Sequence, residues 1–474
     1  MIINKPMRRN LFIVILILFS FHVFANDSIP VFDYYFIRKI NIKGNKRTKK
    51  QIILRELTFQ ENDSICYKGL SEEIKNTREN LLNTLLFNFV TINYNSISQT
   101  NNIEINIEVI ERWYIWPFPI FKFSERNFNT WWKNKNFSRI NYGFFITDNN
   151  FRGRKELMQI KMNFGYDREF SLLYQVPYLD KNQNIGLGFT TGVIYNHETN
   201  YNTFNNKLLY FKDNDNYVKE NYFTQFILTY RNKIHDTHFL YLCFDHFNFS
   251  DTLLKLNNNF SVNNSNHLKY FSIKYWYKND YRDFRSYPLT GYYFDLIIMK
   301  NGFNIFGNNN PDMFYIESTY KKYLKIKKQL YFASAIIAKK SFDKKPAYYL
   351  QTALGYGHNY ARSYEYYVID GKSFVLFKSN FKYALIPTRI KEIDFLPSEK
   401  FSKLYYALYF NIFADAAYVE ANKFSVNNSL ADEFLFGTGI GFDFVTYYDM
   451  VFRIEYSFNR KGDNGVFLHF MAPL

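Results

Sequence analysis

In the segment VFRIEYSF, residues 451–458, apolar and polar side chains alternate from Phe452 onward. Aromatic or aliphatic residues hold the even positions from 452 to 458, and polar residues hold the odd positions between them. The segment FGTGIGFDFV, residues 436–445, repeats the pattern with glycines and Asp443 on its polar side. A period of two predicts β-strands. The apolar side would face the core of a soluble sandwich, or the lipid around a membrane barrel whose polar side lines the lumen.

Composition favours the membrane barrel. Phe, Trp and Tyr make up 21% of the 474 residues. At the start, three basic residues precede an apolar run at residues 11–24. This pattern predicts a signal peptide over residues 1–25 and a linker over residues 26–34. An uncleaved anchor is the alternative, but the run is shorter than the ~20 residues that a spanning helix needs. An exported, aromatic-rich chain without further apolar helices predicts an outer-membrane β-barrel, with a soluble sandwich or solenoid as the alternative.

The charge and the cysteines exclude other classes. The formal net charge is +16, which would suit nucleic acid, but export argues against a nucleic-acid partner. Cys66 and Cys243 fall in segments that we assign to different domains, so no disulfide framework is expected.

The region from residue 117 to 474 contains about sixteen strand candidates, an even number as bacterial barrels require. Short turns alternate with long, Asn-rich loops, which predicts turns on one side of the membrane and loops on the other. One turn, PTRIKEIDFLPSEKFSK at residues 387–403, is long where a short one is expected. The candidate strands begin near residues 118, 140, 155, 169, 185, 219, 237, 269, 291, 313, 329, 374, 404, 434, 450 and 465.

Residues 35–112 have a different pattern, with the order β-α-α-β-β. An alternating strand ends at Gly44, one helix follows Thr48, a second begins at Ser71, and a half-buried hairpin ends the segment. This order resembles a POTRA domain. The residues that carry the resemblance are INIKGNKRT (40–48), RENLLNTLLFNFV (78–90) and IEINIEVIER (103–112).

The resemblance implies a periplasmic module that binds unfolded client chains by strand addition at a sheet edge. The strand carrying Ile103, Ile105 and Ile107 is the candidate edge. The alternative is that the domain is a spacer or a dock for accessory proteins.

One POTRA domain before such a barrel resembles the BamA/TamA superfamily of outer-membrane assembly and translocation proteins. In that family, the sixth extracellular loop carries a Val-Arg-Gly-Phe/Tyr tetrapeptide that folds into the lumen. The matching residues here are Ala361, Arg362, Ser363 and Tyr364, with serine in place of the glycine. If that position needs a positive φ, serine is strained there.

The resemblance also implies that this arginine pairs with an aspartate on a later strand, within a Phe-x-Asp pattern. Phe413 and Asp415 match this pattern, and their parity along the strand places Asp415 on the lumen side. Tyr364, Tyr366 and Tyr367 are then expected to pack the loop inside the barrel. The alternative is an ordinary surface loop.

The resemblance places a closing seam between the first strand, near Phe118, and the last, near Phe467. In the family this seam opens sideways to template a nascent strand. The chain ends at Leu474, whereas family members usually end on an aromatic residue.

No catalytic motif is present, and neither an enzyme nor a cofactor is expected. His235 and His238 form the pattern HDTH, for which solvated side chains are a simpler explanation than a metal site. The sequence therefore predicts a monomeric outer-membrane barrel with its POTRA domain in the periplasm, which inserts or translocates client proteins. The alternatives are a passive pore and, from the Asn-rich loops, a structural or adhesive surface protein.

Overall fold

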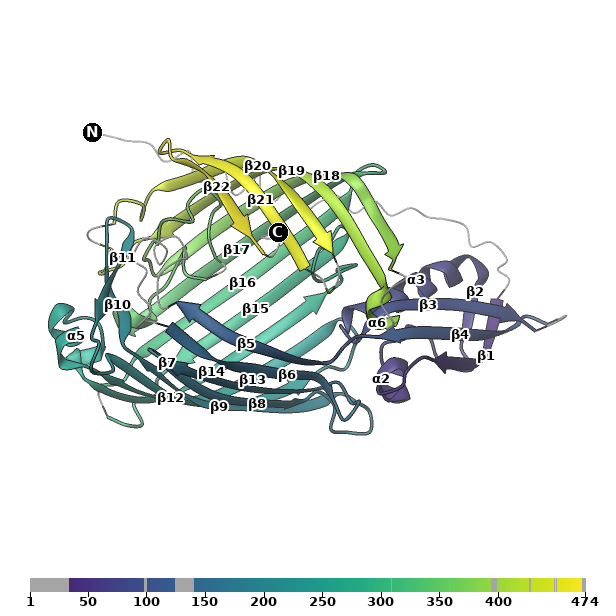
Figure 1. The fold of residues 1–474 in the computed structure, drawn as a ribbon, viewed down its shortest axis with the longest axis horizontal. Coiled ribbons are helices and arrows are strands. Elements are labelled where there is room, and N and C mark those ends of the chain that lie inside the picture. Colours follow the sequence, from purple (N-terminus) through teal and green to yellow (C-terminus); the bar gives the residue numbers. More distant parts are fainter. Residues whose placement is uncertain are drawn as a thin grey trace, which may run out of the picture.

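The computed structural model describes residues 34–470, apart from 98–99, 124–139, 308, 358, 394–398, 426–427, 447 and 449. The expected signal peptide, nearly all of the linker, and Leu474 lie outside the described residues. A small domain sits at one end of a large barrel (Figure 1). In the described part of the chain, no helix is long and apolar enough to cross a bilayer.

The small domain has the predicted β-α-α-β-β order with one short strand added between the helices. Its sheet order is β2-β1-β4-β3, with β1 and β4 parallel. The second helix begins at Tyr67 rather than at Ser71, because the chain leaves the added strand directly into the helix. The elements are β1 (Tyr34–Lys43), α2 (Lys50–Leu54), β2 (Ser64–Cys66), α3 (Tyr67–Asn83), β3 (Phe87–Ser96) and β4 (Asn102–Glu111).

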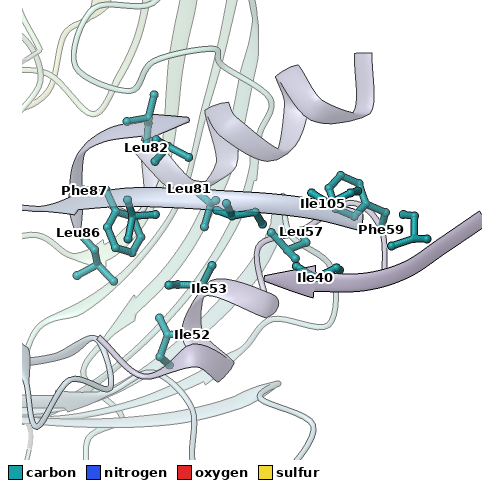
Figure 2. Close-up of a cluster of buried hydrophobic side chains, with 14 of the residues drawn as sticks. Ile40, Ile52, Ile53, Leu57, Phe59, Leu81, Leu82, Leu86, Phe87 and Ile105 are labelled. Carbon is teal, nitrogen blue, oxygen red and sulfur yellow. The ribbon is translucent and has the colours of Figure 1, made fainter. Parts of the chain in front are cut away.

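Alternate side chains of β1 and β4 pack against both helices and form the core of this domain (Figure 2). Ile103, Ile105 and Ile107 are fully buried in it. The prediction that they mark a sheet edge is wrong, because β4 pairs with β1 on one side and with β3 on the other. The parallel pairing with β1 joins segments far apart in the sequence, so the hairpin pattern alone could not reveal it. The edges of this sheet are β2 and β3.

The rest of the chain forms a sixteen-stranded antiparallel sheet, which confirms the predicted fold class. Each strand pairs with the next barrel strand along the chain. The strands are β5 (Ile115–Phe123), β6 (Ile140–Phe151), β7 (Glu156–Gly165), β8 (Arg168–Val176), β9 (Ile185–Asn196), β12 (Lys219–Tyr230), β13 (Asp236–Phe249), β14 (His267–Asp280), β15 (Gly291–Asn301), β16 (Asp312–Lys325), β17 (Leu330–Lys345), β18 (Ser373–Glu392), β19 (Lys403–Glu420), β20 (Phe434–Thr446), β21 (Met450–Asn459) and β22 (Asn464–His469).

The two faces of the sheet differ as the alternation predicts. On β21, the apolar residues at even positions from 452 to 458 are between 39% and 55% exposed, whereas Arg453, Glu455 and Ser457 are buried. β20 shows the same pattern, with Asp443 buried inside. The outward face is therefore apolar over the height of the barrel, and the inward face carries the charges, as a membrane-spanning barrel requires.

Long loops gather at the barrel end far from the small domain (Figure 1). They include a hairpin of β10 (Glu198–Phe204) and β11 (Lys207–Lys212) and the short helices α5 (Asp251–Leu256), η2 (Val262–Asn264) and η3 (Tyr348–Leu350). Apolar residues of these loops share one cluster with the ends of β13 and β14. The loops thus form a packed cap rather than separate extensions.

The long turn that broke the predicted layout joins two long strands, β18 and β19. Before β19 the chain forms α6 (Glu399–Ser402), which reaches the small domain (Figure 1). There the carbonyl oxygen of Lys400 accepts a hydrogen bond of 3.0 Å from the side-chain amide of Asn88. The ring of Phe401 lies 6.4 Å from that of Trp113. The extra length therefore contacts the N-terminal domain.

Candidate functional site: a filled lumen and an unpaired seam

The loop between β17 and β18 enters the barrel, and its tetrapeptide, Ala361, Arg362, Ser363 and Tyr364, is buried there. Ala361 and Tyr364 belong to an apolar cluster with side chains of β17–β20. The sequence folds inward here because a run of apolar and aromatic residues meets the inward apolar positions of those strands, such as Leu376 and Leu435. The loop is therefore a plug rather than a surface loop.

Arg362 forms a two-pronged contact with Asp415 on β19. Its Nε donates to Asp415 Oδ2 at 2.9 Å and its Nη2 to Oδ1 at 2.5 Å, while the Arg362 backbone N–H also donates to Oδ2 at 2.9 Å. The guanidinium lies over the ring of Phe413, 4.0 Å from its centroid. The structure thus brings together the arginine and the Phe-x-Asp pair named from the sequence, in the bidentate geometry that gives strong charge-assisted hydrogen bonds.

Ser363 occupies the position where the family pattern has glycine. Its φ is +72°, and the N–H of Tyr364 donates to the carbonyl of Ala361 at 3.1 Å, so the tetrapeptide is a turn whose third residue is left-handed. The turn lies directly on Gly437 of β20. A Cβ at Gly437 would lie 2.2 Å from the carbonyl oxygen of Arg362. The inward glycine therefore makes room for the loop backbone.

The three tyrosines of the loop behave differently. Tyr364 is buried, and its hydroxyl donates to the carbonyl of Phe436 at 3.3 Å. Tyr367 is half-buried and donates to Asp463 Oδ2 at 2.8 Å. Tyr366 is 58% exposed, so it is not buried like Tyr364. Its ring nevertheless lies 5.1 Å from that of Phe467, on the inward face of β22, so it contacts the inner wall beside the seam.

A second segment enters the lumen from the opposite end. The turn at residues 281–290, between β14 and β15, places Tyr287 against the inner wall, where it is buried. Its hydroxyl donates to Asp443 Oδ2 at 2.6 Å, and Lys382 lies over its ring at 4.2 Å. Asp443 is in turn paired with Arg453. Sequence reasoning placed Asp443 and Arg453 on the polar face but missed Tyr287, since nothing in a turn sequence indicates that it bends inward.

The N-terminal domain contacts the turns at the end of the barrel where this segment enters. Glu56, just after α2, is buried and accepts hydrogen bonds from Arg231 Nη1 at 2.6 Å and Nη2 at 2.7 Å. Arg231 Nη1 also donates to the hydroxyl of Tyr178 at 2.6 Å, and Lys155 Nζ lies 3.7 Å from Glu56. Burial opposes ionisation of Glu56, but the charges of Arg231 and Lys155 outweigh it and hold the pKa of Glu56 well below its usual range.

Further contacts join the same domain to other barrel turns. Arg47 pairs with Asp148 at 2.6 Å. The side-chain amide of Asn83 donates to the carbonyls of Arg282 and Asp283, at 3.0 and 2.9 Å, and thereby contacts the turn that carries Tyr287. A cavity of about 190 Å³ remains between α3, β3 and that turn, lined largely by apolar side chains such as Leu82, Phe89 and Leu289.

The two ends of the sheet, β5 and β22, are joined by no ladder in the part of the chain that the structure describes. Pro117 and Pro119 remove two N–H donors from β5. Strand prolines are tolerated where the missing donor would face away from the ladder, so the free edge of β5 is short of donors. Near the N-terminal domain, the ring of Trp116 meets that of Tyr448 at 5.0 Å. Trp116 of β5 thus contacts the turn between β20 and β21, and no described residue of β22 pairs with the free edge of β5.

His235 and His238 do not converge. His235 Nδ1 contacts the carbonyl of Asp280 at 2.7 Å, whereas His238 Nδ1 contacts the hydroxyl of Tyr275 at 2.8 Å. Each ring therefore has a protein partner of its own.

Comparison with known proteins agrees with this architecture. Residues 35–112 match the family model described as POTRA, surface antigen variable number repeat. Residues 35–112 form a POTRA domain. The family model covers the small domain alone, whereas the matches to solved structures extend over the barrel. No curated protein sequence matches the chain.

Over 92% of its length the chain has the fold of CdiB from Escherichia coli, with a TM-score of 0.52, 11% identity, and coverage of 75% of that chain. BamA from Haemophilus ducreyi lacking POTRA domains 1–3 gives a TM-score of 0.48 at 15% identity, covering 92% and 83%. CdiB from Acinetobacter baumannii gives 0.45 at 11% identity, covering 92% and 73%. The chain thus has one POTRA domain in front of a sixteen-stranded barrel, the architecture that the resemblance in the sequence implied.

Proposed function

We propose that this chain inserts or translocates client proteins at the outer membrane of a Gram-negative-type cell, with its POTRA domain in the periplasm. The observation that carries the proposal is the seam: a sheet with an apolar outer face whose terminal strands, β5 and β22, share no ladder in the described residues. Unpaired backbone groups in lipid cost several kcal/mol each, so such an edge calls for a partner strand. An unfolded client supplies one.

The filled lumen supports the same role and argues against a passive pore. Arg362 and Tyr287 bring plugs into the barrel from its two ends. A solute channel needs an open lumen, whereas a client that folds at the seam does not. Its folding would supply the driving force, as strands pair and apolar faces leave water for lipid.

The POTRA domain contributes an edge for the unfolded client. Its edge strands are β2 and β3, and β3 is long and its second half is exposed. An extended peptide can add to such an edge through main-chain hydrogen bonds. The apolar cavity beside β3 lies at the mouth of the barrel and would receive apolar side chains of the same peptide.

Photo-crosslinking tests the seam. A benzoyl-phenylalanine replaces Phe121, which points outward from β5 and is 64% exposed; the matched control replaces Phe226, which points outward from β12 and is 56% exposed. The variants are reconstituted in vesicles and given urea-unfolded outer-membrane barrel proteins from the same cell. We expect at least fivefold more crosslinked client at Phe121. Equal yields at the two positions would contradict insertion at the seam.

Depletion tests the role in the cell. If this chain assembles other barrel proteins, their amounts in the outer membrane fall after depletion. Normal amounts would count against the assembly role. A large single-channel conductance in planar bilayers that is unchanged by Arg362→Ala would favour the pore instead.

A further inference from the structure

Three ligand-type side chains meet inside the barrel where the plugging loop faces the last two strands. Glu365 comes from the loop, Glu455 from β21 and His469 from β22, and their ligating atoms all lie within 4.8 Å of one another. His469 Nε2 is 3.3 Å from Glu455 Oε1 and 3.9 Å from Glu365 Oε1. Two carboxylates and one imidazole therefore converge from three separate elements.

These groups lack the partners that burial demands. Neither carboxylate oxygen of Glu365 accepts a hydrogen bond from a described residue, and Glu455 Oε2, on a fully buried side chain, accepts none either. Two buried carboxylates side by side repel each other and are costly unless a cation or a proton lies between them.

Two nearby cationic side chains, Arg453 and Lys378, make their closest contacts with other residues. Arg453 forms its close ion pair with Asp443 and comes no nearer than 3.8 Å to Glu455. Lys378 lies over the ring of Tyr360, 4.4 Å from its centroid. Among the described residues, Glu455 therefore has, besides its contact with His469, only a long ion pair with Arg453, and the only ion pair of Glu365 is with His469.

The two distances from His469 fit an ion. Ligand atoms bound at about 2.1 Å to a tetrahedral centre lie about 3.4 Å apart, close to the 3.3 and 3.9 Å measured from His469 Nε2. The other imidazole nitrogen, Nδ1, lies 3.4 Å from the hydroxyl of Tyr360. A metal-binding histidine ordinarily gives its second ring N–H to such an outer partner, which fixes the tautomer.

We propose that Glu365, Glu455 and His469 bind one divalent first-row transition-metal ion, with water completing its coordination. Imidazole with carboxylates suits Zn²⁺, Mn²⁺ or Fe²⁺ better than Mg²⁺ or Ca²⁺, which favour all-oxygen sites. The ion ties the plugging loop to β21 and to β22, the strand at the seam. The site stands independently of any client-handling role.

The test is metal binding by the full chain, purified in detergent without a histidine tag and stripped with a chelator. Titration with Zn²⁺ is followed by calorimetry and titration with Co²⁺ by its visible absorption, which reports coordination. We expect one tight ion per chain, and at least tenfold weaker binding in Glu365→Gln and in His469→Gln. Glu317→Gln, a lumen carboxylate outside the cluster, and His246→Gln, on the outward face of β13, serve as controls with unchanged affinity.

Folding is checked by the shift in gel mobility between unheated and heated samples. Zn²⁺ is further expected to raise the unfolding temperature of the native chain but not that of Glu365→Gln. The proposal is overturned if the native chain binds no Zn²⁺ more tightly than the Glu365→Gln/His469→Gln double variant does. A carboxylate pair that merely shares a proton would give that result.

Discussion

Arg362 and Asp415 lie inside the barrel with side-chain exposures of 0% each. Two charges without solvent stabilise each other only in good geometry, and the loss of one leaves the other buried and unpaired. Here the pair is also the main polar attachment of the plugging loop to β19. The Arg362–Asp415 pair therefore decides whether the plugging loop stays inside the barrel.

We expect Arg362→Met to lower the free energy of unfolding by about 3–5 kcal/mol, because Asp415 then stays buried without its cation. The double variant Arg362→Met/Asp415→Leu should lose clearly less, since neither charge remains. Urea unfolding in lipid vesicles measures Arg362→Met, Asp415→Leu and the double variant, with Arg389→Met on an exposed part of β18 as control. A double variant as unstable as the sum of the two single variants would show that the pair contributes no coupling.

Gly437 allows the loop to approach the wall. Gly437→Ala should destabilise the protein by about 1–3 kcal/mol, because the added methyl overlaps the backbone of Arg362. Gly441→Ala, on the same face of β20, meets its neighbours at 3.0 Å or more and should cost less. Protease cleavage within the loop at residues 346–372 should rise in the first variant alone. Equal cleavage in both would mean that the close approach at Gly437 is not what holds the loop.

At the scale of elements, the turn at residues 281–290 links the POTRA domain to the strands next to the seam. Asn83 of α3 holds its backbone, and Tyr287 reaches Asp443 on β20, which is paired with Arg453 on β21. A movement of the POTRA domain would therefore be transmitted to β20 and β21 through this turn.

Tyr287→Phe removes the hydroxyl that donates to Asp443 and keeps the ring over Lys382. We expect a loss of about 1–2 kcal/mol, since hydrogen bonds to charged groups are among the stronger ones, and faster amide exchange over residues 281–290. Tyr331→Phe is the control, because Tyr331 packs beside the same cluster as Tyr287 through its ring, which lies 6.5 Å from that of Tyr409. Unchanged exchange in Tyr287→Phe would show that the turn is held by other contacts.

At the scale of the whole molecule, one buried network of ion pairs and hydrogen bonds holds the POTRA domain against the barrel. Glu56 is the acidic member among Arg231, Lys155 and Arg55, with Tyr178 donating as well. Burial lowers the pKa of Lys155 to about 8, and Glu56 offsets this only in part. The ionised form of Glu56 is therefore the centre of the docking contact.

Glu56→Gln should weaken docking by about 3 kcal/mol, as the loss of one member of a buried pair does. Spin labels at Tyr94 of the POTRA domain and Leu179 of a barrel turn, both exposed, report the distance between the two parts once Cys66 and Cys243 are replaced. The variant should show a broader, longer distance distribution. Glu72→Gln, at an exposed position of α3, should not.

The same contact predicts a dependence on pH. Docking depresses the pKa of Glu56, so its contribution is complete above the usual value of 4.5 and is lost as the pH falls below it. The distance between the labels should therefore be constant near pH 7 and broaden below about pH 4.5 in the native chain. Glu56→Gln should show little of this acid response. An equal response in both would assign it to other groups.

Sequence reasoning went furthest where one period governs many residues. All sixteen barrel strands begin close to the predicted positions, because a spanning strand must keep lipid-facing and lumen-facing residues in strict alternation. The same parity correctly placed Asp415 on the lumen side. Ser363 marked a strained position, and its φ is indeed positive.

Tertiary contacts decided the rest. The parallel pairing of β1 with β4 turned a predicted edge into a central strand, and the inward path of residues 281–290 brought Tyr287 to Asp443. Glu365, Glu455 and His469 converge from a loop and two strands, so no local sequence pattern indicates that they form a cluster. Alternation is a local property that the chain carries in every strand, whereas these contacts depend on where the closing sheet brings distant segments together.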